Sequence, residues 1–222
     1  MRSLPDIVLF DLDGTLVDSA PGLQRTLNAV LAENGRRPLS LEEVHRFVGE
    51  GLDTLLARAL AATGSALEPG PFRARWFEVY EGLAIQGSPS YPFAGALLRS
   101  LTDQGCRLGL VTNKPQRPTE QILRALGWIG HFEVVLGGDA LPTRKPDPGP
   151  LREALARLPP GRAAYVGDSA IDAQAARGAD LPLVLLRHGY CQEDPDSLGA
   201  QAVVSGLDEV EEALRGLSRA LT

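Results

Sequence analysis

The sequence of 222 residues lacks most of the features that mark secreted, membrane-spanning and nucleic-acid-binding proteins. Its two cysteines, Cys106 and Cys191, are too few for a disulfide framework and do not have the CxxC spacing of a metal or redox site. The first apolar run, residues 7–10, is shorter than that of a secretory signal. The net charge is -6 and no cluster of basic residues interrupts it, which argues against a surface for nucleic acid or anionic membrane. We therefore expect a cytoplasmic protein that binds neither nucleic acid nor membrane.

Lysine is almost absent, whereas arginine is abundant: 20 of the 22 basic residues are arginine. The two lysines are Lys114, within Thr-Asn-Lys-Pro, and Lys145, within Arg-Lys-Pro-Asp-Pro. An ammonium is a compact point charge and a guanidinium is a planar fork, so an arginine-rich chain retains lysine where a point charge is needed. The other explanation is that these two lysines remain by chance in a chain with biased codon usage. Independent evidence for a role of the same two residues is needed to decide between the explanations.

The rest of the composition is that of a globular protein. Hydrophobic residues make up 44% of the chain and charged residues 23%. Short apolar runs, typical of buried parallel strands, alternate with helical patterns through the second half of the chain. The expected strands are residues 6–10, 107–111, 133–136, 163–166, 183–186 and 202–204, and the expected helices are 97–101, 116–126, 150–158, 170–177 and a last one from 208. Because strands joined by helices imply right-handed crossovers, this pattern predicts an α/β fold with a mostly parallel sheet covered on both faces.

A helical block separates the first strand from the others. Ser19 is a good N-cap for a helix that carries apolar residues at helical spacing from Leu23 onward. Ser40 and Glu43 have the spacing of a capping box, and further helical patterns follow at 52–60 and 72–83. No strand pattern occurs between residues 20 and 90. We therefore expect residues 20–90 to be inserted into an α/β core domain that consists of residues 1–19 and 91–222.

Polar residues follow the predicted strands at the sheet edge where parallel α/β proteins bind ligands. These residues, with one from a loop before a later helix, are Asp11, Asp13, Thr112, Asn113, Lys114, Lys145, Asp168 and Asp172. Asp11 and Asp13 are two apart in an extended segment, so both are expected to face one site. Asp168 and Asp172 are four apart at a helix start and share a face. We expect the four carboxylates to converge.

Such a cluster needs a counter-charge, because neighbouring carboxylates push one another toward protonation. A hard divalent cation meets this need, and Mg²⁺, held by carboxylates, water and a substrate phosphate, fits oxygen ligands best. Lys145 and the Thr112 hydroxyl provide the positive and hydrogen-bonding side of a phosphate pocket. The sequence thus predicts a magnesium-assisted phosphate site.

Four segments resemble the ordered motifs of the haloacid dehalogenase-like superfamily: Asp11-Leu-Asp-Gly-Thr15, Thr112-Asn113, Lys145-Pro146 and Gly167-Asp168-Ser-Ala-Ile-Asp172. The resemblance covers nearly the whole chain. It implies a Rossmann-like core, a Mg²⁺-dependent aspartyl-phosphate mechanism and a helical cap at the place of residues 20–90. Within the superfamily, the sequence most resembles bacterial phosphoglycolate phosphatases, in segments such as Phe47-Val-Gly-Glu-Gly51 and Leu110-Val-Thr-Asn-Lys-Pro115.

The resemblance also implies roles for the four carboxylates. Asp11 would be the nucleophile that becomes phosphorylated and a Mg²⁺ ligand. Asp13 would be the general acid and base, with its backbone carbonyl on the metal. Asp168 would bind Mg²⁺, and Asp172 would support the metal shell or Lys145.

The remaining residues are assigned to the phosphate by the same resemblance. Thr112 and Asn113 would hold the phosphoryl oxygens, and Lys145 would neutralise the nucleophile and the transferring group. Lys114 is expected near the substrate, at the rim of the pocket. Substrate choice is expected in the cap around residues 49–51, with Arg46 as a candidate donor to a second anionic group.

These implications predict a phosphatase of small phosphorylated metabolites, with 2-phosphoglycolate, cleaved to glycolate and phosphate, as the first candidate. The aspartate at position 13 favours phosphoryl transfer, since dehalogenases and phosphonatases of the superfamily lack it. The alternatives are a phosphatase of another small metabolite, such as a sugar phosphate, and a phosphomutase. A receiver-type signalling domain, which also phosphorylates an aspartate, is shorter and has no cap. A catalytically silent binding protein would have lost Asp11, Asp13 or Lys145. The oligomeric state has no signal in the sequence.

Overall fold

The computed structural model describes residues 4–64, 69–83 and 88–217, and it contains a six-stranded sheet. The strands are β1 (Ile7–Phe10), β2 (Arg107–Val111), β3 (Phe132–Leu136), β4 (Ala163–Gly167), β5 (Leu183–Leu186) and β6 (Ala202–Val204). Their order is β3-β2-β1-β4-β5-β6, and every neighbouring pair is parallel. In the central strand, Phe10 lies opposite Leu110 of β2 and Val166 of β4. The α/β class and the parallel sheet predicted from the sequence are confirmed.

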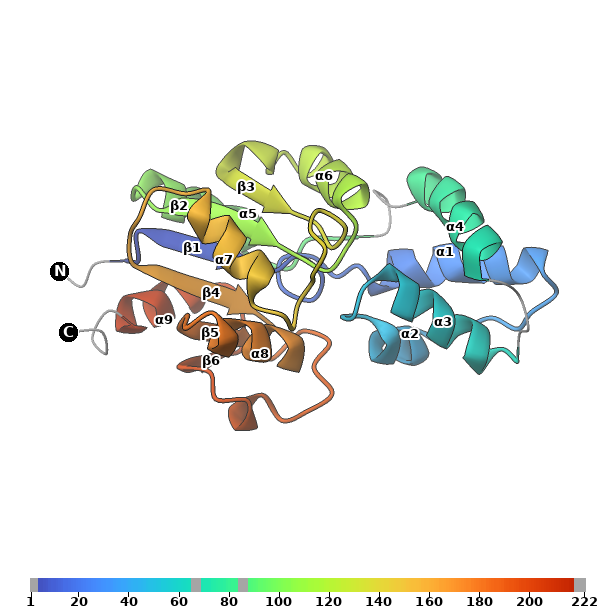
Figure 1. The fold of residues 1–222 in the computed structure, drawn as a ribbon. Helices are drawn as coiled ribbons and strands as arrows, with labels where there is room; N and C mark the ends of the chain where they lie inside the picture. The colour runs from blue at the N-terminus through green and yellow to red at the C-terminus, as the bar shows by residue number, and fades with distance from the viewer. Residues whose placement is uncertain (1–3, 65–68, 84–87, 218–222) are drawn as a thin grey trace.

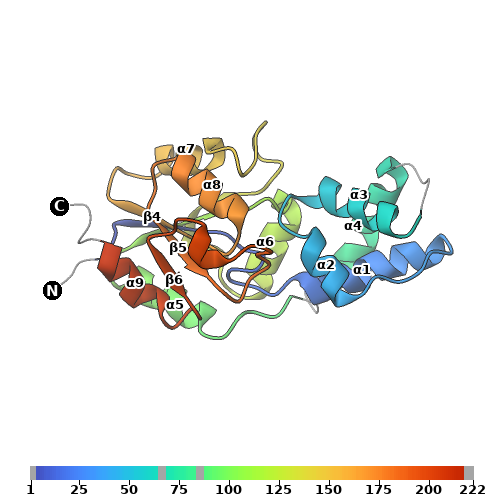
Figure 2. The same cartoon turned by 90° about the horizontal axis from the view of Figure 1, so that it is seen from below.

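Helices cover both faces of this sheet (Figure 2). One face carries α5 (Ala94–Asp103), α6 (Gln116–Ala125) and α9 (Val210–Leu217), and the other carries α7 (Gly149–Ala156) and α8 (Ala170–Gly178). Short 3-10 turns lie at Ile129–His131 and Pro195–Ser197. Because side chains alternate along a strand, Val8 and Phe10 pack with the first set of helices, while Ile7 and Leu9 pack with the second. This two-sided burial explains why the strands are continuous apolar runs.

A second group of helices lies beyond the carboxyl ends of the strands (Figure 1). It consists of α1 (Ala20–Glu33), α2 (Leu41–Phe47), α3 (Leu52–Ala62) and α4 (Pro69–Leu83). These helices share a separate apolar cluster that includes Leu27, Leu56 and Trp76. The apolar sides of these helices are therefore buried against one another, and the loops of the group face the sheet. Within the described residues no helix is both long enough and apolar enough to cross a bilayer.

Of the two helix caps predicted for this group, the structure confirms one and contradicts the other. Ser40 forms the capping box of α2, in which its Oγ accepts from the Glu43 N–H and the Glu43 carboxylate accepts from the Ser40 N–H. Ser19 precedes α1 as expected, but its side chain makes no capping hydrogen bond. The prediction for Ser19 is wrong because its backbone is already helical, with φ of -85° and ψ of -13°, instead of extended as a capping residue requires.

Glu211 links α9 to α5 at the outer surface of the core, which leads to a test by pH. Its carboxylate accepts from the side chains of Gln104 and Ser100 and from Arg215, and these bonds lower the pKa of Glu211 to about 2. A carboxylate with a lowered pKa stabilises the fold above its unfolded pKa and loses this effect as pH falls toward its folded pKa. We expect Glu211→Gln to reduce the free energy of unfolding by about 1 kcal/mol at pH 7 and by less than half of that at pH 3.

Urea denaturation at the two pH values measures this difference. Glu42→Gln is the matched control, because Glu42 is exposed on α2 and has no hydrogen bond or ion pair among the described residues. An equal loss of stability at both pH values for Glu211→Gln would contradict the prediction.

Candidate active site

The carboxyl ends of adjacent strands bring the predicted site residues together. The N–H of Asp11, just after β1, donates to the Val166 carbonyl of β4 at 2.9 Å. The N–H of Thr112, just after β2, donates to the Leu136 carbonyl of β3 at 3.0 Å. The hydrogen bonding of the sheet thus continues one residue past these strands, which holds the backbones of both site residues in place.

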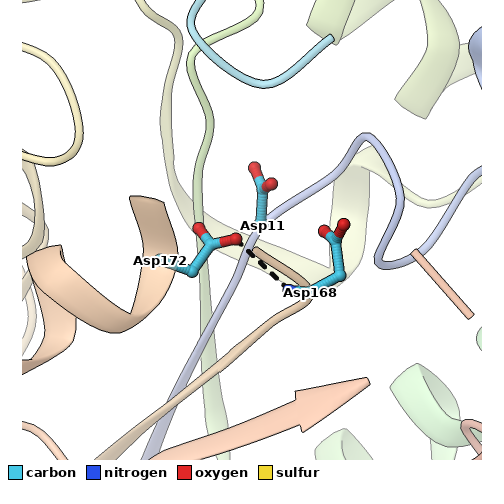
Figure 3. Close-up of side chains that lie close together, drawn as sticks. All are labelled: Asp11, Asp168 and Asp172. Atoms are coloured by element: carbon cyan, nitrogen blue, oxygen red, sulfur yellow. Dashed lines mark hydrogen bonds between the residues drawn. The ribbon is translucent and has the colours of Figure 1, made fainter. Parts of the chain in front are cut away.

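Three carboxylates form one buried cluster (Figure 3). One carboxylate oxygen from each of Asp11, Asp168 and Asp172 lies within 4.8 Å of the other two. Asp13 is not among them, although it lines the same cavities as Asp11. The predicted convergence of four carboxylates is therefore correct for three, because the chain turns after Leu12 and Asp13 pairs with a lysine instead.

Lys145 is the counter-charge inside this cluster. Its Nζ lies 2.9 Å from Asp11 Oδ1, 2.7 Å from Asp172 Oδ1 and 2.8 Å from the Tyr165 hydroxyl, and only 2% of the residue is exposed. Burial alone would lower the pKa of this ammonium, but Asp11 and Asp172 raise the pKa above its usual value. The lysine therefore stays charged, at a fixed point beside Asp11.

Asp172 has no oxygen left for a further ligand. Its Oδ1 accepts from Lys145 and from the Tyr165 hydroxyl. Its Oδ2 accepts from the N–H groups of Asp168 and Ser169 and from the Ser169 hydroxyl, as the N3 residue of a capping box on α8. Asp172 thus orients Lys145 and the segment that carries Asp168, and Asp11 and Asp168 remain as candidate cation ligands.

The charges of the cluster fit a divalent cation. Burial raises the pKa of Asp11 to about 6 against the lowering effect of Lys145, and Asp172 adds to the rise. Burial and the charges of Asp172 and Asp11 raise the pKa of Asp168 well above its usual value. Asp11 Oδ1 also has no hydrogen bond in proper geometry although it is buried. Two neighbouring buried carboxylates whose charged forms are disfavoured make an all-oxygen site suited to a hard ion.

Lys114 and Asp13 form a second ion pair. Lys114 Nζ lies 3.2 Å from Asp13 Oδ1 and 5.2 Å from the centre of the Tyr80 ring. Burial alone would lower the pKa of Lys114, but Asp13 and Tyr80 raise it. Lys114 lines the narrower of the two cavities beside the cluster, but its side chain is only 3% exposed, because Tyr80 of α4 covers it, so it lies in the wall and not at the rim as expected.

Thr112 and Asn113 lie at the same edge, but their side chains are used differently. The Thr112 hydroxyl accepts from the Lys114 N–H, and no described residue accepts its own proton. The Asn113 amide donates to the carbonyls of Gly49 and Lys145, at 2.9 and 2.8 Å. The amide hydrogens of Asn113 thus tie the loop after α2 to the segment of Lys145, which leaves the Thr112 hydroxyl better placed than the Asn113 amide to donate to a phosphate.

Asp168 is held by residues that the sequence interpretation missed. Its Oδ1 accepts from the Thr15 hydroxyl and its Oδ2 from the Tyr190 N–H, each at 2.8 Å. A Cβ on Gly14 or Gly189 would lie 2.4 or 2.1 Å from Asp168 Oδ2, so both positions exclude any side chain. Gly189 and Tyr190 lie shortly after β5. The residues that follow β1, β2 and β4 were examined for site residues, and the same search after β5 would have found these two.

Two cavities adjoin the cluster, and Asp11, Asp13, Val48 and Gly49 line both. The narrower cavity has an empty volume of about 450 Å³, and its wall on the helical group is apolar, with Leu23, Leu52, Leu55 and Trp76. The wider cavity has an empty volume of about 730 Å³ and contains Arg46, Arg58, Glu50, Asp168 and Tyr190. Arg58 pairs with Glu50, whereas Arg46 has no hydrogen bond or ion pair among the described residues.

Comparison with known proteins agrees with this geometry. The family model of the haloacid dehalogenase-like hydrolases matches residues 5–180. The chain is 41% identical over 213 residues to the phosphoglycolate phosphatase of Cereibacter sphaeroides, covering 95% of this chain and 98% of that protein. A solved structure of a predicted phosphoglycolate phosphatase from Haemophilus somnus 129PT superposes with a TM-score of 0.88 at 30% identity, covering 93% of this chain and 96% of that one.

A further solved structure, of a mutant of CbbY from Rhodobacter sphaeroides in complex with xylulose-(1,5)bisphosphate, superposes with a TM-score of 0.82 at 25% identity, covering 95% of this chain and 99% of that one. Sequence, fold and the acidic cluster agree. The chain belongs to the haloacid dehalogenase-like hydrolase family and is a phosphoric monoester hydrolase.

Proposed function

We propose that this chain is a cytoplasmic, Mg²⁺-dependent phosphatase that hydrolyses 2-phosphoglycolate to glycolate and phosphate through a phosphorylated Asp11. The buried Asp11 carboxylate carries the proposal, because its Oδ1 lies 2.9 Å from Lys145 Nζ. A carboxylate oriented by a fixed ammonium and clustered with a second carboxylate, Asp168, is suited to attack a phosphorus atom brought to it.

In the first step an oxygen of Asp11 attacks phosphorus, and the P–O bond to the leaving alcohol breaks. Asp13 protonates the departing oxygen, and the Thr112 hydroxyl and Lys145 stabilise the charge on the transferring group. Mg²⁺, held by Asp11 and Asp168 with the Asp13 carbonyl, would neutralise the phosphoryl oxygens. Asn113 positions the loop at Gly49 and the segment of Lys145 by its two hydrogen bonds.

In the second step water attacks the phosphorus on Asp11. Asp13 takes the proton from this water, the P–O bond to Asp11 breaks, and phosphate leaves with the Asp11 carboxylate restored. Lys114, 3.2 Å from Asp13, holds this carboxylate in place for both proton transfers. Asp172 keeps Lys145 beside Asp11 throughout.

Residues 20–90 act in this scheme as a cap domain over a core of residues 1–19 and 91–222. The cap contributes the apolar wall of the narrower cavity and Arg46 of the wider one. A lid of this kind excludes water and uses the remote part of the substrate to complete the site.

The choice of 2-phosphoglycolate as substrate rests on the relatives that are named phosphoglycolate phosphatase and on the positive charge of Arg46 in the wider cavity. A short substrate with a carboxylate requires a positive partner near the nucleophile. Lys114 is already paired with Asp13, and Arg58 with Glu50, so Arg46 is the unpaired guanidinium among the described residues that line the two cavities. An apolar wall suits a polyol poorly, because its hydroxyl groups would lose their hydrogen bonds with water.

We therefore expect Arg46→Ala to reduce the preference for 2-phosphoglycolate over glucose 6-phosphate. Wild-type kcat/KM should favour 2-phosphoglycolate by at least about tenfold, and a factor of that size corresponds to about 1.4 kcal/mol. The variant should bring the ratio close to one and leave p-nitrophenyl phosphate, which has no carboxylate, nearly unchanged. Arg73→Ala is the matched control, since Arg73 is a cap arginine that pairs with Asp53 and lines neither cavity. A ratio that survives Arg46→Ala would remove Arg46 from substrate recognition.

A panel of phosphate esters, turned over with Mg²⁺ and then with EDTA, tests the whole proposal. We expect 2-phosphoglycolate to give the highest kcat/KM, with free phosphate as product and with loss of activity in EDTA that Mg²⁺ restores. A higher value for a sugar phosphate or a sugar bisphosphate would reassign the substrate. Isomerised sugar phosphate without free phosphate would identify a phosphomutase, and full activity in EDTA would exclude the metal requirement.

A further inference from the structure

Tyr190 belongs to the core by sequence but packs its side chain into the cap. It follows β5, it is 7% exposed, and its ring is part of the apolar cluster formed by the cap helices. The ring lies 5.2 Å from that of His45 on α2. No site role assigned above uses its hydroxyl, so the contacts of this group need an explanation.

The Tyr190 hydroxyl serves the start of α1, where Ser19 fails to cap. It accepts from the Ala20 N–H at 3.0 Å and donates to Asp18 Oδ1 at 2.8 Å. The first N–H groups of a helix have no partner within the helix, and Pro21 has no N–H to offer. A side chain 170 residues away in sequence therefore supplies the hydrogen-bond acceptor that the local sequence does not.

The same residue also holds the metal-site carboxylate. Its backbone N–H donates to Asp168 Oδ2 at 2.8 Å. The preceding Gly189 lies so close that a Cβ there would be 2.1 Å from this oxygen. A shift of the Tyr190 backbone must therefore displace the Asp168 carboxylate or break its hydrogen bond.

The Tyr190 hydroxyl bonds to residues 18–20, where the chain passes from the core into the cap. The chain returns from the cap to the core beside this segment, and we call the two adjacent connections the hinge. Val17 and Ser90 form an isolated antiparallel bridge, and the Asp18 N–H donates to the Pro89 carbonyl at 2.9 Å. Any rotation of the cap relative to the sheet has to change the chain near these residues. The hydroxyl of Tyr190 is thus bonded to the hinge, and its backbone N–H is bonded to Asp168.

We infer that Tyr190 is a positioning residue that couples the position of the cap to the orientation of Asp168, so that metal affinity depends on the hinge contact. This inference rests on the proposed role of Asp168 in binding Mg²⁺. The coupling passes through two atoms of one residue, the hydroxyl at Asp18 and Ala20 and the backbone nitrogen at Asp168. It predicts that removing the hydroxyl weakens the metal site although the hydroxyl does not touch it.

The test compares Mg²⁺ binding to wild-type protein, Tyr190→Phe, Asp18→Ala and the double variant by isothermal titration calorimetry. Tyr190→Phe retains the ring and the backbone N–H, so we expect it to fold and to raise the dissociation constant for Mg²⁺ by about threefold to tenfold, less than the loss typical of a direct partner of a metal ligand. Asp18→Ala, which removes the acceptor of the Tyr190 hydroxyl, should act in the same direction. The double variant should match the stronger single variant, because both changes break one connection. Hydrogen exchange of residues 18–24 should be faster in Tyr190→Phe.

Thr26→Val is the matched control, because Thr26 has a buried hydroxyl on α1 whose one hydrogen bond among the described residues is to the Gly22 carbonyl of the same helix. It should lower the melting temperature without changing Mg²⁺ binding. Unchanged Mg²⁺ affinity in Tyr190→Phe, or additive effects in the double variant, would overturn the coupling and leave the proposed phosphatase intact. Failure of the wild-type protein to bind Mg²⁺ would overturn both the metal requirement and the coupling.

Discussion

Asp11→Asn is expected to fold normally and to hydrolyse no phosphate ester at a detectable rate. The amide has nearly the shape of the carboxylate but is not a nucleophile toward phosphorus, so the first step has no substitute. The fold should tolerate the change, because burial raises the pKa of Asp11 to about 6 and its charge at neutral pH is therefore unfavourable. Lys145 keeps its contact of 2.7 Å with Asp172.

Steady-state assays with 2-phosphoglycolate, together with thermal melting, measure both parts of this result. Asp103→Asn is the matched control, because Asp103 is exposed at the end of α5 and has no described partner. It should retain full activity. Turnover by an Asp11→Asn preparation in which mass spectrometry finds no deamidated protein would refute the role of Asp11.

The second large effect is expected from Lys145→Arg, with Lys114→Arg as its comparison. Lys145 is enclosed by Asp11, Asp172 and Tyr165, and a planar guanidinium cannot occupy the place of a point charge among them. We expect kcat to fall by at least about a thousandfold, because several kcal/mol of charge stabilisation at the phosphoryl group are lost. The loss should be equal for 2-phosphoglycolate and p-nitrophenyl phosphate, since Lys145 acts on the nucleophile and the phosphoryl group that all esters share.

Lys114→Arg should discriminate between these substrates. Lys114 is as deeply buried as Lys145 but contacts Asp13, the proposed proton donor to the leaving group. Its replacement should slow 2-phosphoglycolate more than p-nitrophenyl phosphate, because nitrophenolate leaves without protonation. Initial rates on both esters for both variants give the comparison. A leaving-group dependence found for Lys145→Arg, and absent for Lys114→Arg, would show that the two lysines have the opposite roles.

The helical and strand segments were largely predictable because their signals are local. The central strands are short apolar runs bounded by polar residues, and burial on both faces of a parallel sheet requires that composition. The capping box of α2 was visible because Ser40 and Glu43 are three residues apart. The same reasoning failed at Ser19, where the backbone is helical and Tyr190 supplies the acceptor from the other end of the chain.

The lysines illustrate the limit within the site itself. Both residues were singled out by their rarity, and both lie at the predicted sheet edge. Their partners were not predictable, since pairing of Lys114 with Asp13 depends on the turn after Leu12 and on the covering Tyr80 of α4. A rim position for Lys114 was a reasonable expectation for a loop residue, and tertiary packing made it a buried ion pair.

Composition, periodicity and the order of short motifs were thus enough for the α/β class and for the set of acidic and basic residues at the strand ends. These properties depend on neighbours in the chain and on the alternation of strand side chains. That Asp11 lies beside Asp168, and that the Tyr190 hydroxyl accepts from the Ala20 N–H, depends on contacts between segments more than a hundred residues apart. The pairing of Asp172 with Lys145 joins two segments that are 27 residues apart. Such contacts arise only when the segments pack together in the folded chain, because no local pattern specifies the distance between two side chains from distant parts of a sequence.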